Sequence, residues 1–338
     1  MPSADLRIRI PDFMAPWPPQ EQGWPWQARM HPATDSIQAE SEQWLRAYEG
    51  VEGTLVDKIV KGRFPDIACL IYGHQSREHC LLAALIMLHF FVIDEVTDHE
   101  GEAAVREKAD AMTHALRNPG LPLGASDEWV GVHMAADITT QYRAVGTRES
   151  WEFFVGTFAD YLDGVVIEAA ARDKPILSRA DYLAIRVKTI GILPGMAMAL
   201  IDCDLQPGFL DLDVVKPLMG LSVLILIHQN DLYSFDKEQA RGEDGHNGVR
   251  VLMEERQIGV QAAMDSLGGE TTALVREFVH LCENLPVLED ETNNAHLRVL
   301  RDGCISWIIG MDVWYTQVTM RYGMQRLDKD RTYKPTQI

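Results

Sequence analysis

The chain has 338 residues, of which 46% are hydrophobic and 24% charged, and 31 Lys and Arg against 50 Asp and Glu give it a formal net charge of −19. This length and apolar content allow a large buried core, in one large domain or in two. The acidity argues against a nucleic-acid-binding protein and against docking on an anionic membrane surface, so any anionic ligand must be neutralised by a few placed Lys or Arg side chains or by metal ions.

Residues 1–34 are expected to form an extended arm packed on the rest of the chain. Residues 1–32 hold seven of the sixteen prolines and three of the eight tryptophans, Trp17, Trp24 and Trp26. This proline content excludes a regular helix, and the aromatic side chains are suited to hold the segment against a larger core. The arm contains no continuous apolar segment typical of a secretory signal.

From about Asp35 onward, apolar residues recur with a helical period and with almost no strand-like alternation. Gly and Pro residues interrupt the periodic segments. No repeat, low-complexity linker or shift in composition divides them, so we expect an all-α fold with one domain over 35–326 and a C-terminal tail over 327–338. The predicted helices are 36–49, 54–62, 76–98, 101–116, 126–144, 148–171, 179–201, 214–240, 246–256, 259–285 and 291–325.

The cysteines and the apolar runs together favour a soluble cytoplasmic protein. The longest apolar runs, Leu81–Ile93 and Pro217–Ile227, are shorter than the roughly 18 residues that cross a bilayer. The five cysteines show no Cys-x-x-Cys spacing, which is typical of buried free thiols in a reducing compartment rather than of disulfides or a zinc site. They are Cys69, Cys80, Cys203, Cys282 and Cys304.

Oxygen-bearing side chains follow directly after the first of these apolar runs. Asp94 and Asp98 are four residues apart, so they share one side of a helix, while Glu95 lies about a quarter-turn away. A helix that is apolar on nearly all sides lies in the interior, where an unpaired carboxylate is costly. Alone, this pattern is typical of a solvated acidic surface; at the end of a core helix it indicates a cation site.

The second apolar run also ends in oxygen-bearing side chains. Asn230, Ser234 and Glu238 are spaced i, i+4 and i+8 and therefore form one stripe on a helix. Carboxylate, amide and hydroxyl oxygens are the hard donors that Mg²⁺ prefers, and substrate phosphates commonly complete its coordination. Because each motif has the other as partner, the pair predicts a magnesium site far more strongly than either motif alone.

These two motifs resemble those of the class I terpene synthases. Asp94-Glu95-x-x-Asp98, preceded by Phe90-Phe91, is similar to the aspartate-rich motif DDxxD, with Glu95 in place of the second Asp. Asn230-Asp231-x-x-Ser234-x-x-Lys237-Glu238 matches the motif NDxxSxxKE at every defined position.

Two basic sites extend the resemblance over residues 90–322. Arg186, with Thr189-x-Gly191 after it, resembles the arginine that precedes T-x-G in the family, although Val187 stands where many relatives have a second arginine and leaves Lys188 as an alternative. Arg321-Tyr322 resembles the family's C-terminal Arg-Tyr pair. The stretch from Gln239 to Asn247 is most similar to fungal, basidiomycete-type sesquiterpene cyclases.

The resemblance implies a single class I terpenoid synthase helical bundle around a central apolar active-site cavity. It implies three Mg²⁺ ions, with Asp94 holding two of them, Asp98 in the outer shell, and Asn230, Ser234 and Glu238 holding the third. Glu95 is not expected to be a direct ligand. It further implies catalytic roles for Gly191, through its carbonyl dipole, and for four donors to the substrate diphosphate, and a substrate-binding role for three aromatic side chains. The donors are Arg186, Lys237, Arg321 and Tyr322, and the aromatics are Phe90, Phe91 and Trp314.

The expected function is therefore that of a sesquiterpene synthase, a carbon–oxygen lyase. It would ionise and cyclise farnesyl diphosphate, with ring closure between C1 and C11 as a further hypothesis, and would act as a monomer or homodimer. Alternatives are a mono- or diterpene cyclase that uses geranyl or geranylgeranyl diphosphate, a chain-elongating prenyltransferase, and a non-catalytic helical binding protein. The second motif lacks the triple carboxylate of the prenyltransferases, which disfavours that alternative.

Overall fold

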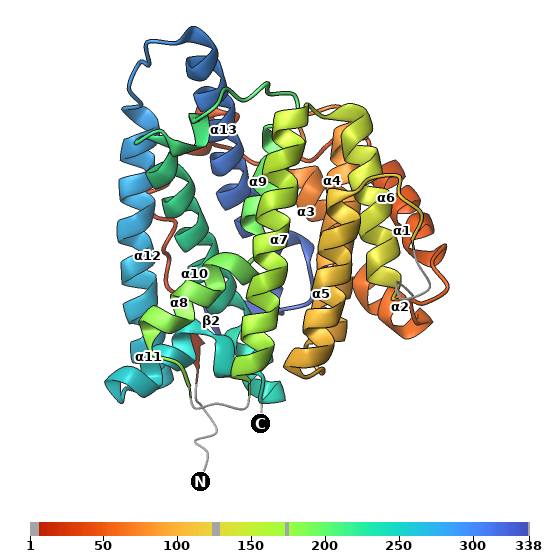
Figure 1. Ribbon diagram of the computed structural model, residues 1–338. Helices are drawn as coiled ribbons and strands as arrows, with labels where there is room; N and C mark the ends of the chain where they lie inside the picture. The colour runs from red at the N-terminus through yellow and green to blue at the C-terminus, as the bar shows by residue number, and fades with distance from the viewer. Residues whose placement is uncertain (1–6, 124–128, 173–175, 337–338) are drawn as a thin grey trace.

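A computed structural model describes residues 7–123, 129–172 and 176–336, and nearly all of its regular structure is helical. The helices pack as a bundle in which α4, α7, α9, α10 and α13 surround the centre (Figure 1). The helices are α1 (Thr34–Arg46), α2 (Gly53–Gly62), α3 (Pro65–Ile71), α4 (Arg77–Thr97), α5 (Glu102–Arg117), α6 (Val130–Val145), α7 (Arg148–Ala171), α8 (Arg179–Thr189), α9 (Ile192–Ala199), α10 (Val215–Arg241), α11 (Gly248–Arg256), α12 (Val260–Glu283) and α13 (Glu291–Val313). Short 3₁₀ turns lie at Gln20–Gln22, Phe209–Asp211, Asp244–His246 and Met324–Arg326.

The all-α prediction is confirmed, with differences at three places. Helix α3 was not predicted: its seven residues are all buried, so it has no polar face to give a period. The helix predicted over 179–201 is two helices, which meet at a bend of 41°. The helix predicted over 291–325 ends at Val313 and continues as a π-helical turn, Trp314–Val318. The predicted start of the 126–144 helix lies outside the described residues.

Helix α4 is the most apolar long helix of the bundle. Its N-terminus is capped by Ser76, whose hydroxyl accepts from the backbone N–H of His79 at 3.1 Å. It is the one helix in the described ranges that is long and apolar enough by itself to cross a membrane, with a mean hydropathy of 2.0, and 67% of that stretch is buried inside the protein. Such burial is typical of a core helix.

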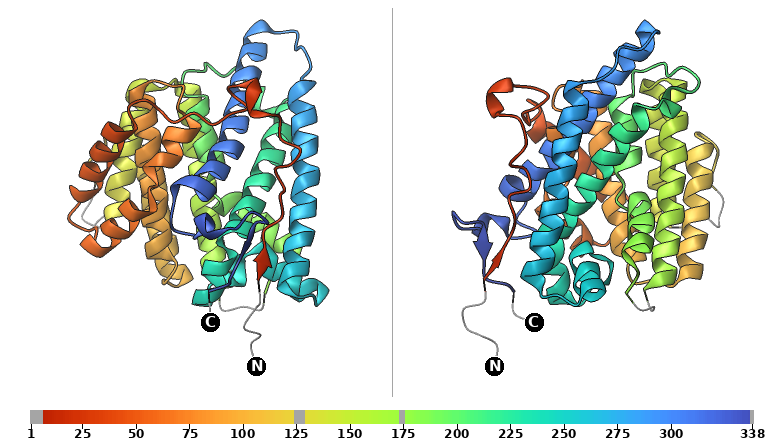
Figure 2. Two further views of the ribbon diagram at one scale, coloured as in Figure 1. Left: turned by 180° about the vertical axis from the view of Figure 1, so that it is seen from behind. Right: turned by 90° about the vertical axis from the view of Figure 1, so that its left-hand side faces the viewer.

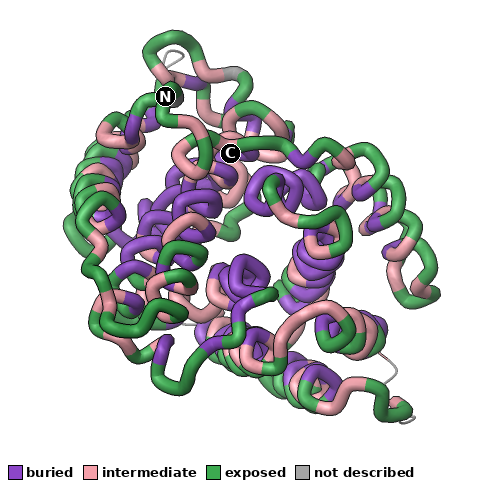
Figure 3. Tube along the Cα trace, turned by 90° about the horizontal axis from the view of Figure 1, so that it is seen from above, coloured by how far each residue is buried: buried purple, intermediate pink, exposed green. Residues whose placement is uncertain are grey.

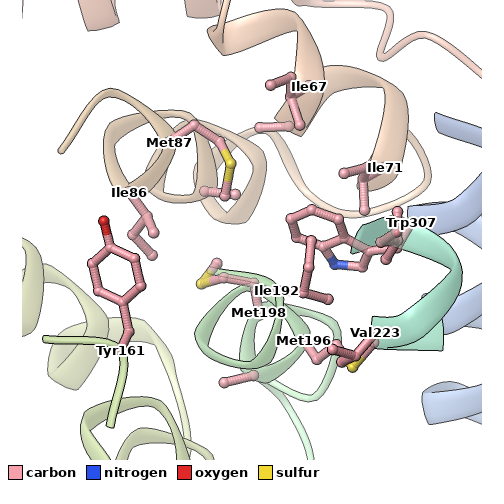
Figure 4. Close-up of a cluster of buried hydrophobic side chains, with 14 of the residues drawn as sticks. Ile67, Ile71, Ile86, Met87, Tyr161, Ile192, Met196, Met198, Val223 and Trp307 are labelled. Atoms are coloured by element: carbon pink, nitrogen blue, oxygen red, sulfur yellow. The ribbon is translucent and has the colours of Figure 1, made fainter. Parts of the chain in front are cut away.

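The core lies between the inner sides of the helices. Seen from above, the buried residues lie toward the middle of the ring of helices and the exposed ones toward its outside (Figure 3). Helix α9 passes through this core, where the side chains of five neighbouring helices converge on it (Figure 4). The cluster includes Ile67 and Ile71 of α3, Ile86 and Met87 of α4, Tyr161 of α7, Ile192, Met196 and Met198 of α9, Val223 of α10 and Trp307 of α13.

The first and the last described segments of the chain meet on the outside of the bundle. Strand β1 (Ile8–Arg9) pairs antiparallel with β2 (Thr332–Tyr333), and the arm runs on from β1 beside α12 (Figure 2). Phe13 of the arm is fully buried against Tyr233 of α10, at 5.6 Å between ring centroids. After β2, Thr336 donates through its backbone N–H and its hydroxyl to Asp236 of α10, at 2.8 and 2.7 Å. Both segments are therefore fastened to α10.

Candidate active site

The first acidic motif occupies the last turn of α4. Asp94 and Asp98 keep exposed surface although protein atoms surround much of each carboxylate, and Asp98 is the C-terminal cap of the helix. Arg172, after the end of α7, donates to the carbonyl oxygens of Thr97 at 2.6 Å and Glu100 at 2.8 Å, and its Nη2 lies 3.8 Å from Asp98 Oδ1. Arg172 therefore satisfies carbonyl groups that the helix end leaves without partners, and holds the turn that carries the carboxylates.

Excess negative charge gathers at this turn. Burial raises the pKa of Asp94 to about 6, with the charges of Glu168 and Glu95 adding to it, while Arg321 opposes the shift. Burial, the charge of Asp94 and the charge of Glu168 raise the pKa of Asp98 to about 8. Carboxylates that resist ionisation because of each other are stabilised by a bound cation, so the site fits a metal ion.

Because both pKa values are raised in the folded state, these carboxylates favour folding less as the pH rises. The folded protein holds their protons above the unfolded pKa of about 4, so the stability of the metal-free protein falls from about pH 4 to about pH 8 through these groups. In a chelating buffer, we expect Asp98→Asn to raise the unfolding temperature more at pH 8 than at pH 5.5. An equal change in unfolding temperature at the two pH values would contradict the raised pKa of Asp98.

Glu95 of the same turn faces away from the other two carboxylates. It pairs with Lys58 of α2, and its Oε1 accepts from Arg321 at 3.4 Å. Burial opposes ionisation of Glu95, but the hydrogen bond and charge of Lys58 and the charge of Arg321 hold its pKa below the ordinary value. Glu95 is therefore an ionised bridge between two cations.

The second motif lies on the C-terminal half of α10. Asn230 is held from two sides: its Oδ1 accepts from Arg186 of α8 at 2.8 Å, and its Nδ2 donates to the Tyr315 hydroxyl at 2.7 Å. Asp231 points the other way and accepts from the hydroxyl of Tyr182 at 2.6 Å. The structure thus brings together Asn230 and Arg186, which the sequence assigned to separate motifs.

Ser234 and Glu238 share one partner, Asn247. The Asn247 amide Nδ2 donates to Glu238 Oε2 at 2.9 Å, lies 3.4 Å from Ser234 Oγ, and donates to the Asp231 carbonyl oxygen at 3.0 Å. Its Oδ1 accepts from the backbone N–H of Val249 and caps α11. A single buried side chain therefore ties the stripe on α10 to the start of the next helix.

The predicted basic residues surround the two motifs. Arg321 lies over the rings of Phe64, Phe91 and Tyr322, with its Cζ 5.3, 5.9 and 5.8 Å from the centroids. Lys237 lies over the Tyr322 ring at 5.3 Å. Burial lowers the pKa of Lys237 to about 7, helped by the charges of Arg321 and Arg241. The positive charges of Lys237, Arg321 and Arg241 repel one another, so a bound anion would stabilise this cluster.

Two hydrogen-bond donors without partners also favour a bound anion at this site. In the described part of the chain, the Nε atoms of Arg186 and Arg321 are buried without a hydrogen-bond partner. A buried guanidinium N–H without an acceptor is costly, and an anionic ligand would satisfy it.

The second motif would add mainly neutral oxygen ligands to the candidate metal site, from Asn230 and Ser234. Within the described residues, no three His, Cys, Asp or Glu side chains lie close enough together to hold a metal ion. The oxygen of Asn230 is engaged by Arg186. The donor chemistry still fits a divalent cation of the hard type, since every candidate ligand offers oxygen.

Gly191 interrupts the chain between α8 and α9, inside the segment predicted as one helix over 179–201. Its φ of +71° is in the left-handed region, and Phe90 of α4 lies beside it, 3.7 Å from the position of an added Cβ. Phe90 packs against Phe158 and Tyr161 of α7, with centroids 5.0 and 4.9 Å apart. The break thus lies next to an aromatic wall formed by α4 and α7.

We expect Gly191→Ala to destabilise the protein by about 1–2 kcal/mol, because an L-residue is strained in the left-handed region while the added Cβ makes only ordinary contact with Phe90. Urea denaturation measures this change. Gly156→Ala is the control, because Gly156 is helical and its added Cβ meets nothing within 4 Å, so this variant should be more stable than wild type by up to about 1 kcal/mol.

The other two predicted pocket aromatics lie closer to Arg321. Phe91 is half-buried and stacks on Phe64. Trp314 is only 1% exposed, and its indole N–H donates to the carbonyl of Arg63 at 3.0 Å. In this conformation Trp314 supports Phe64 from behind and does not face open space.

Three residues at the site were missed by the sequence analysis. They supply contacts that depend on tertiary packing: Arg172 on the end of α4, Glu168 near the first motif, and Asn247 on Glu238. The one usable signal was at Asn247, since an Asn before a helical segment is a typical N-cap. That signal predicts the cap but not the bond to Glu238.

Comparisons with known proteins identify the family of the chain. The family model described as terpene synthase family 2, C-terminal metal binding, matches residues 86–277. A Delta(6)-protoilludene synthase of Stereum hirsutum is 31% identical over 94% of this chain and 89% of its own, and sesquiterpene synthase 14 of Postia placenta is 30% identical over 82% and 78%. Among solved structures, a hedycaryol synthase in complex with HEPES superposes with a TM-score of 0.75 at 18% identity, covering 92% of this chain and 99% of that one.

Proposed function

Because the chain belongs to the class I terpene synthase family and is of the fungal type, we propose that it is a sesquiterpene synthase that ionises farnesyl diphosphate with Mg²⁺, cyclises the carbocation and releases diphosphate. The matched relatives named as sesquiterpene and protoilludene synthases support this proposal. The observation that carries it is the hydrogen bond of Arg186 to Asn230, because it sets a half-buried cationic donor directly on the candidate metal motif.

Two sets of side chains would hold the metal ions, three Mg²⁺ in the proposal. Asp94 would be the main ligand on α4 with Asp98 in the outer shell, and Asn230, Ser234 and Glu238 would form the set on α10. Bound Mg²⁺ would supply the positive charge that stabilises the diphosphate as it leaves. Asn230 Oδ1 accepts one hydrogen bond from Arg186 and keeps a second lone pair that could face a metal ion.

The protein's own donors would meet the leaving group. Arg186 and Arg321 carry unpartnered Nε–H groups, and Lys237 and Tyr322 lie beside Arg321. Charge-assisted hydrogen bonds from preplaced donors strengthen as the oxygen charge develops, which favours ionisation of the C–O bond. An anion beside Lys237 would also restore its full positive charge.

The carbocation would then be held away from water. Phe90 and Phe91 would present ring faces to it, since the negative face of an aromatic ring attracts a cation. Gly191, with no side chain beside Phe90, would let its backbone carbonyl approach the same space. Exclusion of water prevents capture of the cation as an alcohol.

The test is incubation of the purified protein with farnesyl diphosphate and Mg²⁺, followed by gas chromatography with mass spectrometry. We expect a metal-dependent sesquiterpene and free diphosphate, with geranyl and geranylgeranyl diphosphate as poorer substrates in parallel arms. A longer prenyl diphosphate after addition of isopentenyl diphosphate would contradict the cyclase proposal.

Ring closure between C1 and C11 is the finer part of the proposal. It rests on the similarity of the Asn230–Asn247 stretch to fungal cyclases. The same chromatogram tests this hypothesis. A germacrene-type product profile without humulene-derived products would contradict ring closure between C1 and C11.

A further inference from the structure

A pocket of about 500 Å³ lies beside the two candidate metal motifs, between α2, the last turns of α10 and the segment around Arg321. Its wall contains five cationic side chains and one carboxylate. In a chain with a net charge of −19, such a concentration of positive charge focuses a local field that attracts anions. The charged residues of the wall are Lys58, Lys61, Lys237, Arg241, Arg321 and Asp57.

Glu95 pairs with two cations of this wall, Lys58 and Arg321, and the pairing of the remaining wall residues is weaker. Asp57 is already paired with Arg46, at 3.2 Å. Arg241 lies 3.7 Å from Glu243, and both side chains are more than 40% exposed, so that pair is weak. Lys61 makes no ion pair within the described ranges.

The pocket has an inner and an outer wall. Lys237 and Arg321 form the inner wall, and both lie over the ring of Tyr322. The outer wall carries Lys61 and Arg241, which take no part in the proposed metal or donor sets. The pocket is therefore continuous with the candidate active site through two shared side chains, while its outer cations have no role assigned to them.

The chemistry of the wall selects for a compact polyanion. With one carboxylate, already engaged, the pocket does not offer the oxygen ligands of a metal site. Lysine ammonium groups and two guanidinium groups from separate segments offer charge-assisted donors to phosphate oxygens. The proposed reaction releases such an anion at Lys237 and Arg321.

We propose that this pocket is an outer diphosphate-binding site, which holds the diphosphate group beyond its metal-bound position. The identity of this ligand rests on the proposed function. The group has two sources, the head of the incoming isoprenyl diphosphate and the inorganic diphosphate that leaves, and Lys61 and Arg241 contact it in either case.

The direct test is titration calorimetry with inorganic diphosphate in EDTA, without metal. We expect wild type to bind and Lys61→Ala/Arg241→Ala to bind about tenfold more weakly, since two charge-assisted donors are lost. Lys216→Ala is the matched control, because Lys216 is an exposed lysine near the opposite end of α10, paired with Asp211 at 3.1 Å, and should leave the affinity unchanged. Equal affinities of wild type and the double variant, or no binding by wild type, would overturn the proposal.

Kinetics with farnesyl diphosphate distinguish the two sources. The single-turnover rate of bound substrate should stay within about twofold of wild type, because neither replaced residue touches the reacting bond. A lower kcat with altered product inhibition assigns the pocket to the leaving anion, and a lower kcat/KM assigns it to the incoming head group. No change in any of these quantities would overturn the proposal.

Failure of the proposed function would be recognised separately. Wild type that turns over no isoprenyl diphosphate refutes the assigned reaction, whereas the metal-free titration still decides whether the pocket binds diphosphate.

Discussion

Asp94→Asn is expected to lower Mg²⁺-dependent turnover of farnesyl diphosphate by about 10²–10³-fold, the scale of losing one group that stabilises transition-state charge. The neutral amide has the shape of the carboxylate but lacks the charge that recruits the cation. Asp94 is also a charge that the metal-free fold resists, since burial and Glu168 raise its pKa to about 6. Removing that charge should therefore leave the metal-free protein as stable as wild type at pH 8, or more stable.

This opposition between activity and stability separates a metal-ligand role from a structural one. Initial rates over a range of Mg²⁺ concentrations, together with thermal unfolding in a chelator, measure the two quantities. Asp110→Asn is the matched control, because Asp110 is an exposed acidic residue on α5, and it should change neither quantity. Retention of wild-type kinetics by Asp94→Asn would remove Asp94 from the metal site; loss of activity with loss of stability would indicate damage to the fold.

The fold was largely predictable because most helices carry their own signals. The 3.6-residue period and the Gly and Pro interruptions placed α7 at the residues where the structure has it. Helix α3 escaped because a fully buried helix has no alternating polar face. The π-helical turn at Trp314–Val318 escaped for another reason: its geometry places Tyr315 on Asn230, a tertiary contact that no local pattern encodes.

The candidate site was predictable as a set of residues and not as an arrangement. Helical spacing placed Asp94 and Asp98 on one side of α4. In the structure the two are close enough for the charge of Asp94 to raise the pKa of Asp98. Spacing says nothing about partners from distant elements, such as Arg186 on Asn230, 44 residues apart. Such contacts depend on how helices cross, which sequence periodicity does not determine.

The second large expected effect concerns Asn247, which positions Glu238 and Ser234 from outside the motif. Asn247→Ser retains a good helix cap for α11 but has a side chain too short to reach Glu238. Because partners that orient metal ligands commonly contribute 10–100-fold to metal affinity, we expect the Mg²⁺ concentration for half-maximal activity to rise by about that factor. Saturating Mg²⁺ should restore much of kcat, since the ligands themselves are intact.

A purely structural role for Asn247 predicts a different result. Loss of the cap alone would lower stability without altering the Mg²⁺ requirement. Asp290→Ser controls for this: Asp290 caps α13 in the same manner, accepting from the N–H of Asn293 at 2.7 Å, and the variant should leave the Mg²⁺ dependence at the wild-type value. If Asn247→Ser also kept that value, either Glu238 and Ser234 would not hold the metal or Asn247 would not orient them. The single variant Glu238→Gln separates these cases: a raised Mg²⁺ requirement would keep Glu238 at the metal and remove only the orienting role of Asn247, whereas an unchanged requirement would remove Glu238 from the metal site.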